Sequence, residues 1–167
     1  MATAHDVAAY ILSRLGPTSA MKLQKLVYYS QSWHLVWDDR PLFPERIEAW
    51  ANGPVVPDLY DRHRGQFEVT VIEGGDPDRL SPGERETVDI VLGAYGGLDG
   101  RKLSHLTHAE SPWRDARHGL APTARSNAMI TEAALVEYYG ALDAAEDATS
   151  VGDLRWEGWD SPAPTAI

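Results

Sequence analysis

The feature that most constrains the fold is the segment from residue 18 to residue 37, which contains no Gly or Pro and carries apolar residues at helical spacing. Thr18 or Ser19 can cap its N-terminus, because a hydroxyl oxygen accepts a hydrogen bond from the first turn. Its apolar face is wide and predicts contact on two sides, with two layers of its own domain or with its domain and a partner. The face comprises Leu23, Leu26, Val27, Tyr28, Tyr29, Trp33, His34 and Trp37.

Further helices are predicted on both sides of this segment. Thr3 and Asp6 resemble a capping box before a first helix, and Ser81 with Glu84 forms a complete capping box before a helix that ends near Gly96. Additional helices are predicted at 58–64, 103–110, 111–119 and 130–147. The pattern therefore favours a compact domain of several helices.

Two segments between the helices favour extended structure. Ile47–Trp50 is followed by Asn52-Gly53-Pro54, a strong turn signal because Asn and Gly tolerate positive φ. Residues 67–72 alternate at period two and predict a strand that could pair with 47–50 in a small antiparallel sheet. The expected fold is mainly α (α+β), a compact multi-helix domain over residues 1–147 with a small antiparallel β element.

Composition narrows the class of protein. A length of 167 residues fits one domain with a tail, and the absence of cysteine excludes disulfides and thiolate zinc sites. A formal charge of −10 argues against a nucleic-acid-binding surface, since affinity for phosphate comes largely from Lys and Arg. The N-terminus does not resemble a signal peptide and no apolar run is long enough to span a membrane. We expect a cytoplasmic protein.

The segment 148–167 is predicted to be an acidic tail. Residues 141–167 hold six acids against one base, so half of the excess negative charge lies there, where it would steer a basic protein partner. Trp156 and Trp159 lie in this tail. Exposed tryptophan is unfavourable in a polar tail, so these side chains either fold back on the domain or anchor a partner.

No catalytic or cofactor motif is complete. His105 and His108 could share a metal on one helix face, but a third ligand at suitable spacing is absent. There is no Gly-x-Ser-x-Gly elbow, and the glycines at 96–100 lack the Lys-Ser/Thr ending of a phosphate loop. The residues favour a non-enzyme without cofactor or metal, and a hydrolase that uses His105 or His108 remains the competing class.

An ordered set of short motifs resembles the Panacea, or SocA-like, antitoxin domain, which is also found in phage-associated GepA-like proteins. The resemblance spans about residues 3–140. It rests on residues 21–29, 33–34, 40–43, 47–50, 53–56, 103–108, 111–113 and 126–127.

The resemblance implies a mainly helical antitoxin that neutralises a cognate toxin by direct binding, with a role in phage defence. It also implies an alternative, since the founding member is an adaptor that delivers its toxin to the ClpXP protease. The acidic tail is a candidate protease-docking element, so removal of 150–167 would abolish delivery but not toxin binding.

We place the toxin-binding surface near the turn between Trp50 and Tyr60 and the central helix. Gly53-Pro54 would fix that loop, so little entropy is lost on docking. The competing interpretation is that the same residues form the core. The candidate partner-binding residues are Trp33, His34, Trp50, Pro54, Val55, Tyr60, Trp156 and Trp159.

Overall fold

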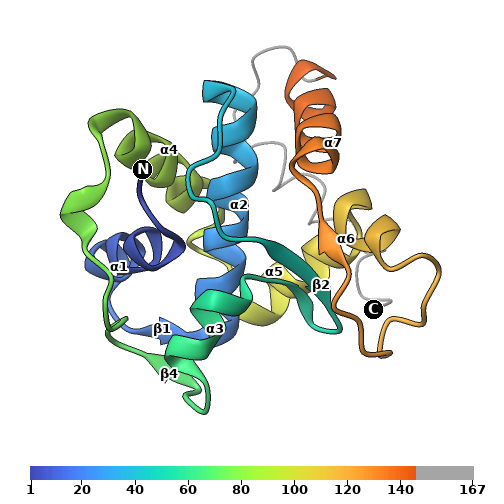
Figure 1. Ribbon diagram of the computed structural model, residues 1–167, viewed down its shortest axis with the longest axis horizontal. Coiled ribbons are helices and arrows are strands. Elements are labelled where there is room, and N and C mark those ends of the chain that lie inside the picture. Colours follow the sequence, from blue (N-terminus) through green and yellow to red (C-terminus); the bar gives the residue numbers. More distant parts are fainter. Residues whose placement is uncertain (146–167) are drawn as a thin grey trace.

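The computed structural model describes residues 1–145 as a mainly helical α+β domain, which confirms the expected fold class (Figure 1). In chain order, the helices are α1 Ala4–Leu15, α2 Ala20–Asp38, α3 Pro57–His63, the 3₁₀ helix Pro77–Arg79, α4 Pro82–Tyr95, α5 Gly100–His108, α6 Ser111–Ala116 and α7 Glu132–Ala145. The strands are β1 Thr18–Ser19, β2 Ile47–Trp50, β3 Gly53–Val55, β4 Glu68–Val69 and β5 Met129–Ile130.

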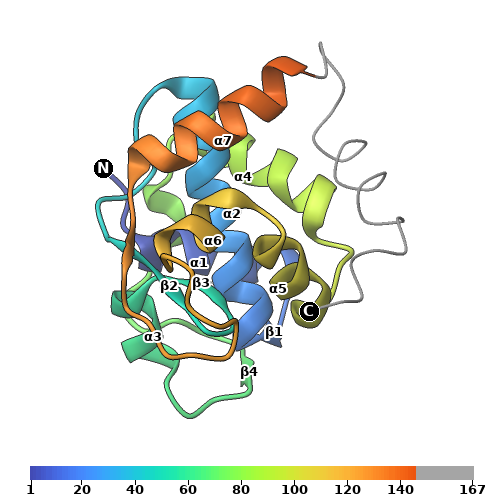
Figure 2. The ribbon, with the colours of Figure 1, turned by 90° about the vertical axis from the view of Figure 1, so that its right-hand side faces the viewer.

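Helix α2 runs through the middle of the domain and is covered by α1, α4, α5 and α7 (Figures 1 and 2). Ser19, and not Thr18, is its N-cap, because the Ser19 hydroxyl accepts a hydrogen bond from the backbone N–H of Lys22. The helix ends at Asp38, and its C-cap, Asp39, has a left-handed φ of 57°. Every residue from Leu23 to Leu35 is buried. The wide apolar face is therefore explained by layers of its own domain on several sides.

The two predicted capping boxes are present and begin α1 and α4. The Thr3 hydroxyl accepts from the Asp6 backbone, while the Asp6 carboxylate accepts from the Thr3 backbone. Ser81 and Glu84 make the same reciprocal pair at α4. Each box satisfies two backbone N–H groups that a helix start would leave unpaired.

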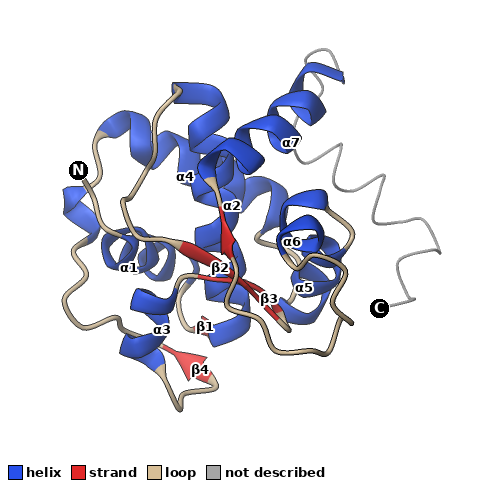
Figure 3. Ribbon diagram, turned by 45° about the vertical axis from the view of Figure 1, so that its right-hand side comes forward, coloured by secondary structure: helices blue, strands red, loops and turns tan. Residues whose placement is uncertain are grey.

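The extended segment at 47–50 forms a three-stranded antiparallel sheet in the order β3-β2-β5. β2 pairs with β3 through the predicted turn, with Trp50 opposite Gly53, and with β5 through Ile47 opposite Ile130. Figure 3 shows these strands lying against α2, with helices around them. The expectation that Ile130 begins the last helix is wrong, because its backbone pairs with β2 and α7 begins at Glu132.

The predicted pairing of 67–72 with 47–50 is also wrong. Only Glu68–Val69 is a strand, and it pairs with β1 through Val69 opposite Thr18. Val69 is buried, but Phe67 and Val71 are 87% and 71% exposed, so the apolar alternation does not mark a buried face. The 47–50 strand already has a partner on each side, which leaves no free edge for this segment.

The helices of the second half complete the core around α2. α5 and α7 pack against α2, and α6 packs against α5, α7 and β2. Within residues 1–145, no helix is long and apolar enough to cross a membrane.

Candidate functional site

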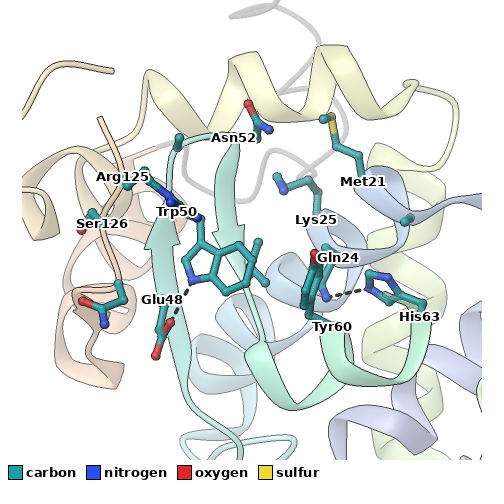
Figure 4. Close-up of a pocket in the computed structure, with 14 residues that line it drawn as sticks. Met21, Gln24, Lys25, Glu48, Trp50, Asn52, Tyr60, His63, Arg125 and Ser126 are labelled. Carbon is teal, nitrogen blue, oxygen red and sulfur yellow. Dashed lines mark hydrogen bonds between the residues drawn. The ribbon is translucent and has the colours of Figure 1, made fainter. Parts of the chain in front are cut away.

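A pocket of about 710 Å³ opens between the start of α2, the β2–β3 hairpin, α3 and the loop before β5 (Figure 4). A volume of this size is typical of small-molecule sites. Its wall combines aromatic and apolar side chains with several polar groups. The lining residues are Ala20, Met21, Gln24, Lys25, Glu48, Trp50, Ala51, Asn52, Val55, Tyr60, His63, Arg125, Ser126 and Asn127.

The hairpin that forms one wall is fixed from behind by α5 and α6. The Trp113 indole N–H donates to the Trp50 carbonyl at 2.7 Å, and the Ser104 hydroxyl donates to the Asn52 carbonyl at 2.6 Å. The buried Arg117 guanidinium donates to the Ala49 carbonyl at 3.0 Å. These bonds satisfy two carbonyls of β2 and one of the turn, so this wall is preformed.

An aromatic pair forms the outer part of the pocket. The Trp50 and Tyr60 rings meet edge to face with centroids 5.0 Å apart. The Trp50 indole N–H donates to Glu48 Oε1 at 2.8 Å (Figure 4). The other carboxylate oxygen accepts from Arg46. Both oxygens of Glu48 therefore already have donors. Trp50 and Tyr60 line the pocket and remain partly exposed.

Gln24 joins α2 to the corner between β3 and α3. Its carbonyl oxygen accepts from the Val56 backbone N–H at 2.9 Å, and its amide nitrogen lies 3.0 Å from His63 Nε2. Burial lowers the pKa of His63, so the ring is neutral near pH 7 and can accept from the Gln24 amide. This connection fixes the floor of the pocket.

Lys25 is the unusual group of the site. Its side chain is only 1% exposed, yet within residues 1–145 its ammonium makes no hydrogen bond or ion pair. Figure 4 shows it extending from α2 toward the hairpin. Burial lowers its pKa from 10.5 to about 7, because an unpaired charge is costly in a low-dielectric site.

Gly53 gives Lys25 the room to lie there. A Cβ at residue 53 would lie 2.5 Å from Lys25 Cε and 3.3 Å from Nζ. The backbone φ of Gly53 is +116°, which L side chains rarely adopt. Glycine at this position is therefore favoured by the backbone conformation of the hairpin, and it also leaves room for Lys25.

The comparisons with known proteins give one family. The family model described as antitoxin SocA-like, Panacea domain, matches residues 23–114, more than half of the chain. The chain belongs to the SocA-like antitoxin family. Neither the curated proteins nor the solved structures yield a match. Membership supports an antitoxin role in a toxin–antitoxin pair in general terms, and the matched range contains the pocket residues from Gln24 to His63.

The Panacea domain brings together some of the predicted partner-binding residues and not others. Trp50, Val55 and Tyr60 line the pocket, and Pro54 is buried beside Val55 in β3. Trp156 and Trp159 lie outside the described residues.

Trp33 and His34 are fully buried within the Panacea domain. The Trp33 indole donates to the Tyr95 hydroxyl at 3.0 Å, and His34 Nδ1 lies 2.9 Å from Thr87 Oγ1. A partner cannot contact either side chain while the domain is folded this way. Their assignment to the contact surface is corrected: they hold α2 against α4.

Sequence reasoning missed Lys25, Gln24 and Arg117. Local sequence does not single out Lys25, because Lys22 also lacks an acidic residue three or four positions away and yet does not line the pocket. Arg117 was missed because its guanidinium joins the distant Ala49 carbonyl to carbonyls of its own loop, such as that of Ala121, and no local motif marks this arrangement.

The histidines considered as metal ligands, His105 and His108, are not among the residues that line the pocket. His108 stacks on Trp113 with ring centroids 3.9 Å apart, and burial lowers its pKa to about 4. Among residues 1–145, no group of three or more His, Cys, Asp or Glu side chains could hold a metal ion.

Proposed function

We propose that this chain neutralises a cognate toxin by direct protein–protein binding through the face that carries the pocket. The observation that carries the proposal is the family match over 23–114, within which the partly exposed Trp50 and Tyr60 lie at the opening. Partly exposed aromatic side chains on a rigid support are favoured as anchors in protein interfaces. We further propose that the chain acts as a binding protein and not as an enzyme.

Preformation of this face supports direct binding. The hairpin is held by side chains from α5 and α6, and α3 is held by Gln24. Docking on a surface that is already ordered avoids much of the entropy cost of fixing loops and side chains. The net charge of −10 would in addition speed encounter with a basic toxin.

Phe67 extends apolar surface next to the pocket wall. It is 87% exposed, and its carbonyl accepts from the backbone N–H of Ala20, a lining residue, at 2.8 Å. Because the side chain is exposed, its replacement leaves the core intact. A substitution of Phe67 therefore tests whether this surface binds the toxin while the fold stays intact.

The experiment is co-expression with the product of the adjacent reading frame, with growth as the readout. The wild-type chain is expected to restore growth, whereas Tyr60→Asp and Phe67→Asp restore it poorly. Ile90→Asp, on α4 and 46% exposed, is the matched control and should restore growth fully. Full rescue by both Tyr60→Asp and Phe67→Asp, or no rescue by the wild-type chain, would overturn the proposal.

A further inference from the structure

We infer that the pocket is a binding site for a small organic acid whose carboxylate pairs with Lys25 and whose flat apolar body lies against Trp50 and Tyr60. Such a site goes beyond toxin binding, because it can be filled in the isolated chain. Three observations carry it: an unpartnered buried amine, a cavity of ligand size and an aromatic wall.

The amine selects the charge of the ligand. The Lys25 ammonium has no protein partner within residues 1–145, so a carboxylate that reaches it through the pocket supplies a charged hydrogen-bond acceptor. The acid in the pocket wall, Glu48, does not serve this purpose, since its oxygens accept from Trp50 and Arg46. Arg125 adds a second positive charge to the lining.

The remaining polar groups favour a ligand that also accepts hydrogen bonds. The side chains of Asn52, Ser126 and Asn127 line the pocket, and each can donate to an acceptor. The apolar contribution comes from Met21, Trp50 and Tyr60. Sites that orient a small ligand usually have mostly apolar walls with a small number of polar groups.

Binding would be linked to pH through the amine. The charged or titratable groups that face Lys25 are His63 on α3, His108 on α5, Glu48 on β2 and Arg125 in the loop before β5. Both histidines are neutral near pH 7, because burial lowers their pKa values. The protonation state that changes between pH 6 and pH 9 is thus that of Lys25, whose pKa is about 7. An anion should bind more weakly as pH rises through this range.

The test uses the purified full-length chain with benzoate as probe and benzamide as its neutral counterpart. Binding is followed by NMR through the Trp50 indole and the side-chain amides of Gln24 and Asn52. Benzoate is expected to bind about 10- to 100-fold more tightly than benzamide, the range of a hydrogen bond to a charged group. Its affinity is expected to fall at least about tenfold from pH 6 to pH 9.

Two variants distinguish the role of the Lys25 amine in binding from the general effects of removing a lysine. Lys25→Met should remove the advantage of benzoate over benzamide. Lys22→Met is the matched control on the same helix, since the Lys22 amine donates to the Gly96 carbonyl and does not line the pocket. It should leave benzoate binding unchanged.

Three results would overturn the inference: equal binding of benzoate and benzamide, undiminished benzoate binding by Lys25→Met, or no saturable shift of the pocket signals by benzoate. If benzoate fails while the toxin still perturbs the same signals, the pocket is a protein contact only. That result would leave the proposed toxin binding standing and remove the ligand site.

Discussion

Two of the buried polar groups on helix α2, at Tyr29 and at Lys25, differ in whether their hydrogen bonds are satisfied. At the first, the hydroxyls of Tyr29 and Tyr139 both donate to Glu110 Oε1, at 2.8 and 2.7 Å, and Tyr28 bonds to Tyr139 at 3.0 Å. At the second, the Lys25 amine has no partner within residues 1–145. The first arrangement stabilises the fold, and the second leaves an interaction open to a ligand.

The satisfied group is built from three helices that are distant in sequence. Glu110 lies at the start of α6, the tyrosines belong to α2 and α7, and all of them are buried. Burial, together with the Glu110 carboxylate, raises the pKa of Tyr28 and Tyr139 well above 10, so both phenols remain donors. The cluster joins α2, α6 and α7 through donors and acceptors that match.

Disruption of this cluster is expected to cause the largest change in the stability of the domain. Glu110→Ala should destabilise the domain by about 3–5 kcal/mol, because two buried hydroxyls lose their acceptor and a cavity remains. Urea denaturation followed by circular dichroism measures the change. Glu110→Gln is the control: both tyrosines donate to one oxygen, which an amide can replace, so it should lose less than half as much. Equal losses in the two variants would show that hydrogen bonding to Oε1 is not what stabilises the cluster.

At Lys25, by contrast, a substitution is expected to raise the stability of the domain. Lys25→Met should stabilise the domain by about 2–4 kcal/mol at pH 7, since it removes an unpaired buried amine whose pKa is lowered from 10.5 to about 7. The unfolded chain binds the extra proton between these two pH values, so wild-type stability from this group rises from pH 7 to pH 10.5. The advantage of Lys25→Met should therefore shrink over that range.

Chemical denaturation at pH 7 and pH 10 measures this prediction. Lys22→Met serves as the control, and it should lose about 1 kcal/mol because it removes the hydrogen bond to Gly96. A Lys25→Met variant less stable than the wild-type chain would mean that the amine is satisfied in solution, and the contrast between the two places would fail.

His34 is an intermediate case, because only one of its two ring nitrogens has a hydrogen-bond partner. Removal of that partner should cause the smallest of these changes in stability. Its Nδ1 lies 2.9 Å from Thr87 Oγ1, while its buried Nε2 makes no hydrogen bond and lies 3.6 Å from an Asp38 carboxylate oxygen. Thr87→Val should cost about 1–2 kcal/mol, since it removes the remaining partner of a buried ring nitrogen. Thermal denaturation measures it, with the exposed Thr123→Val as control. A loss no larger than that of the control would show that the Thr87 bond contributes nothing.

Much of the fold could be predicted because it follows from local signals. The capping boxes at Thr3 and Ser81 and the Asn52-Gly53 turn each act within four residues, and each appears as expected. The partner of the 67–72 segment could not be predicted, because alternation at period two does not say which edge is free. Ile130 was misplaced for the same reason: its strand exists only through pairing with Ile47.

The residues of the candidate site also differ in whether the sequence could predict them. Trp50, Val55 and Tyr60 line the pocket, and their predicted contact with a toxin stays a prediction. Trp33 and His34 were placed at the surface because a wide helical face cannot distinguish a partner from α4 and α7 of the same domain. The amine of Lys25 was missed because its environment is made by Gly53, on a different element.

The most direct test of the central claim is the dissociation constant between this chain and the product of the adjacent reading frame, measured by titration calorimetry. Tyr60→Asp and Phe67→Asp are expected to weaken binding at least about tenfold, and Ile90→Asp to leave it unchanged, with all variants confirmed as folded. Wild-type affinity in both Tyr60→Asp and Phe67→Asp would contradict the claim that the face carrying the pocket binds the toxin.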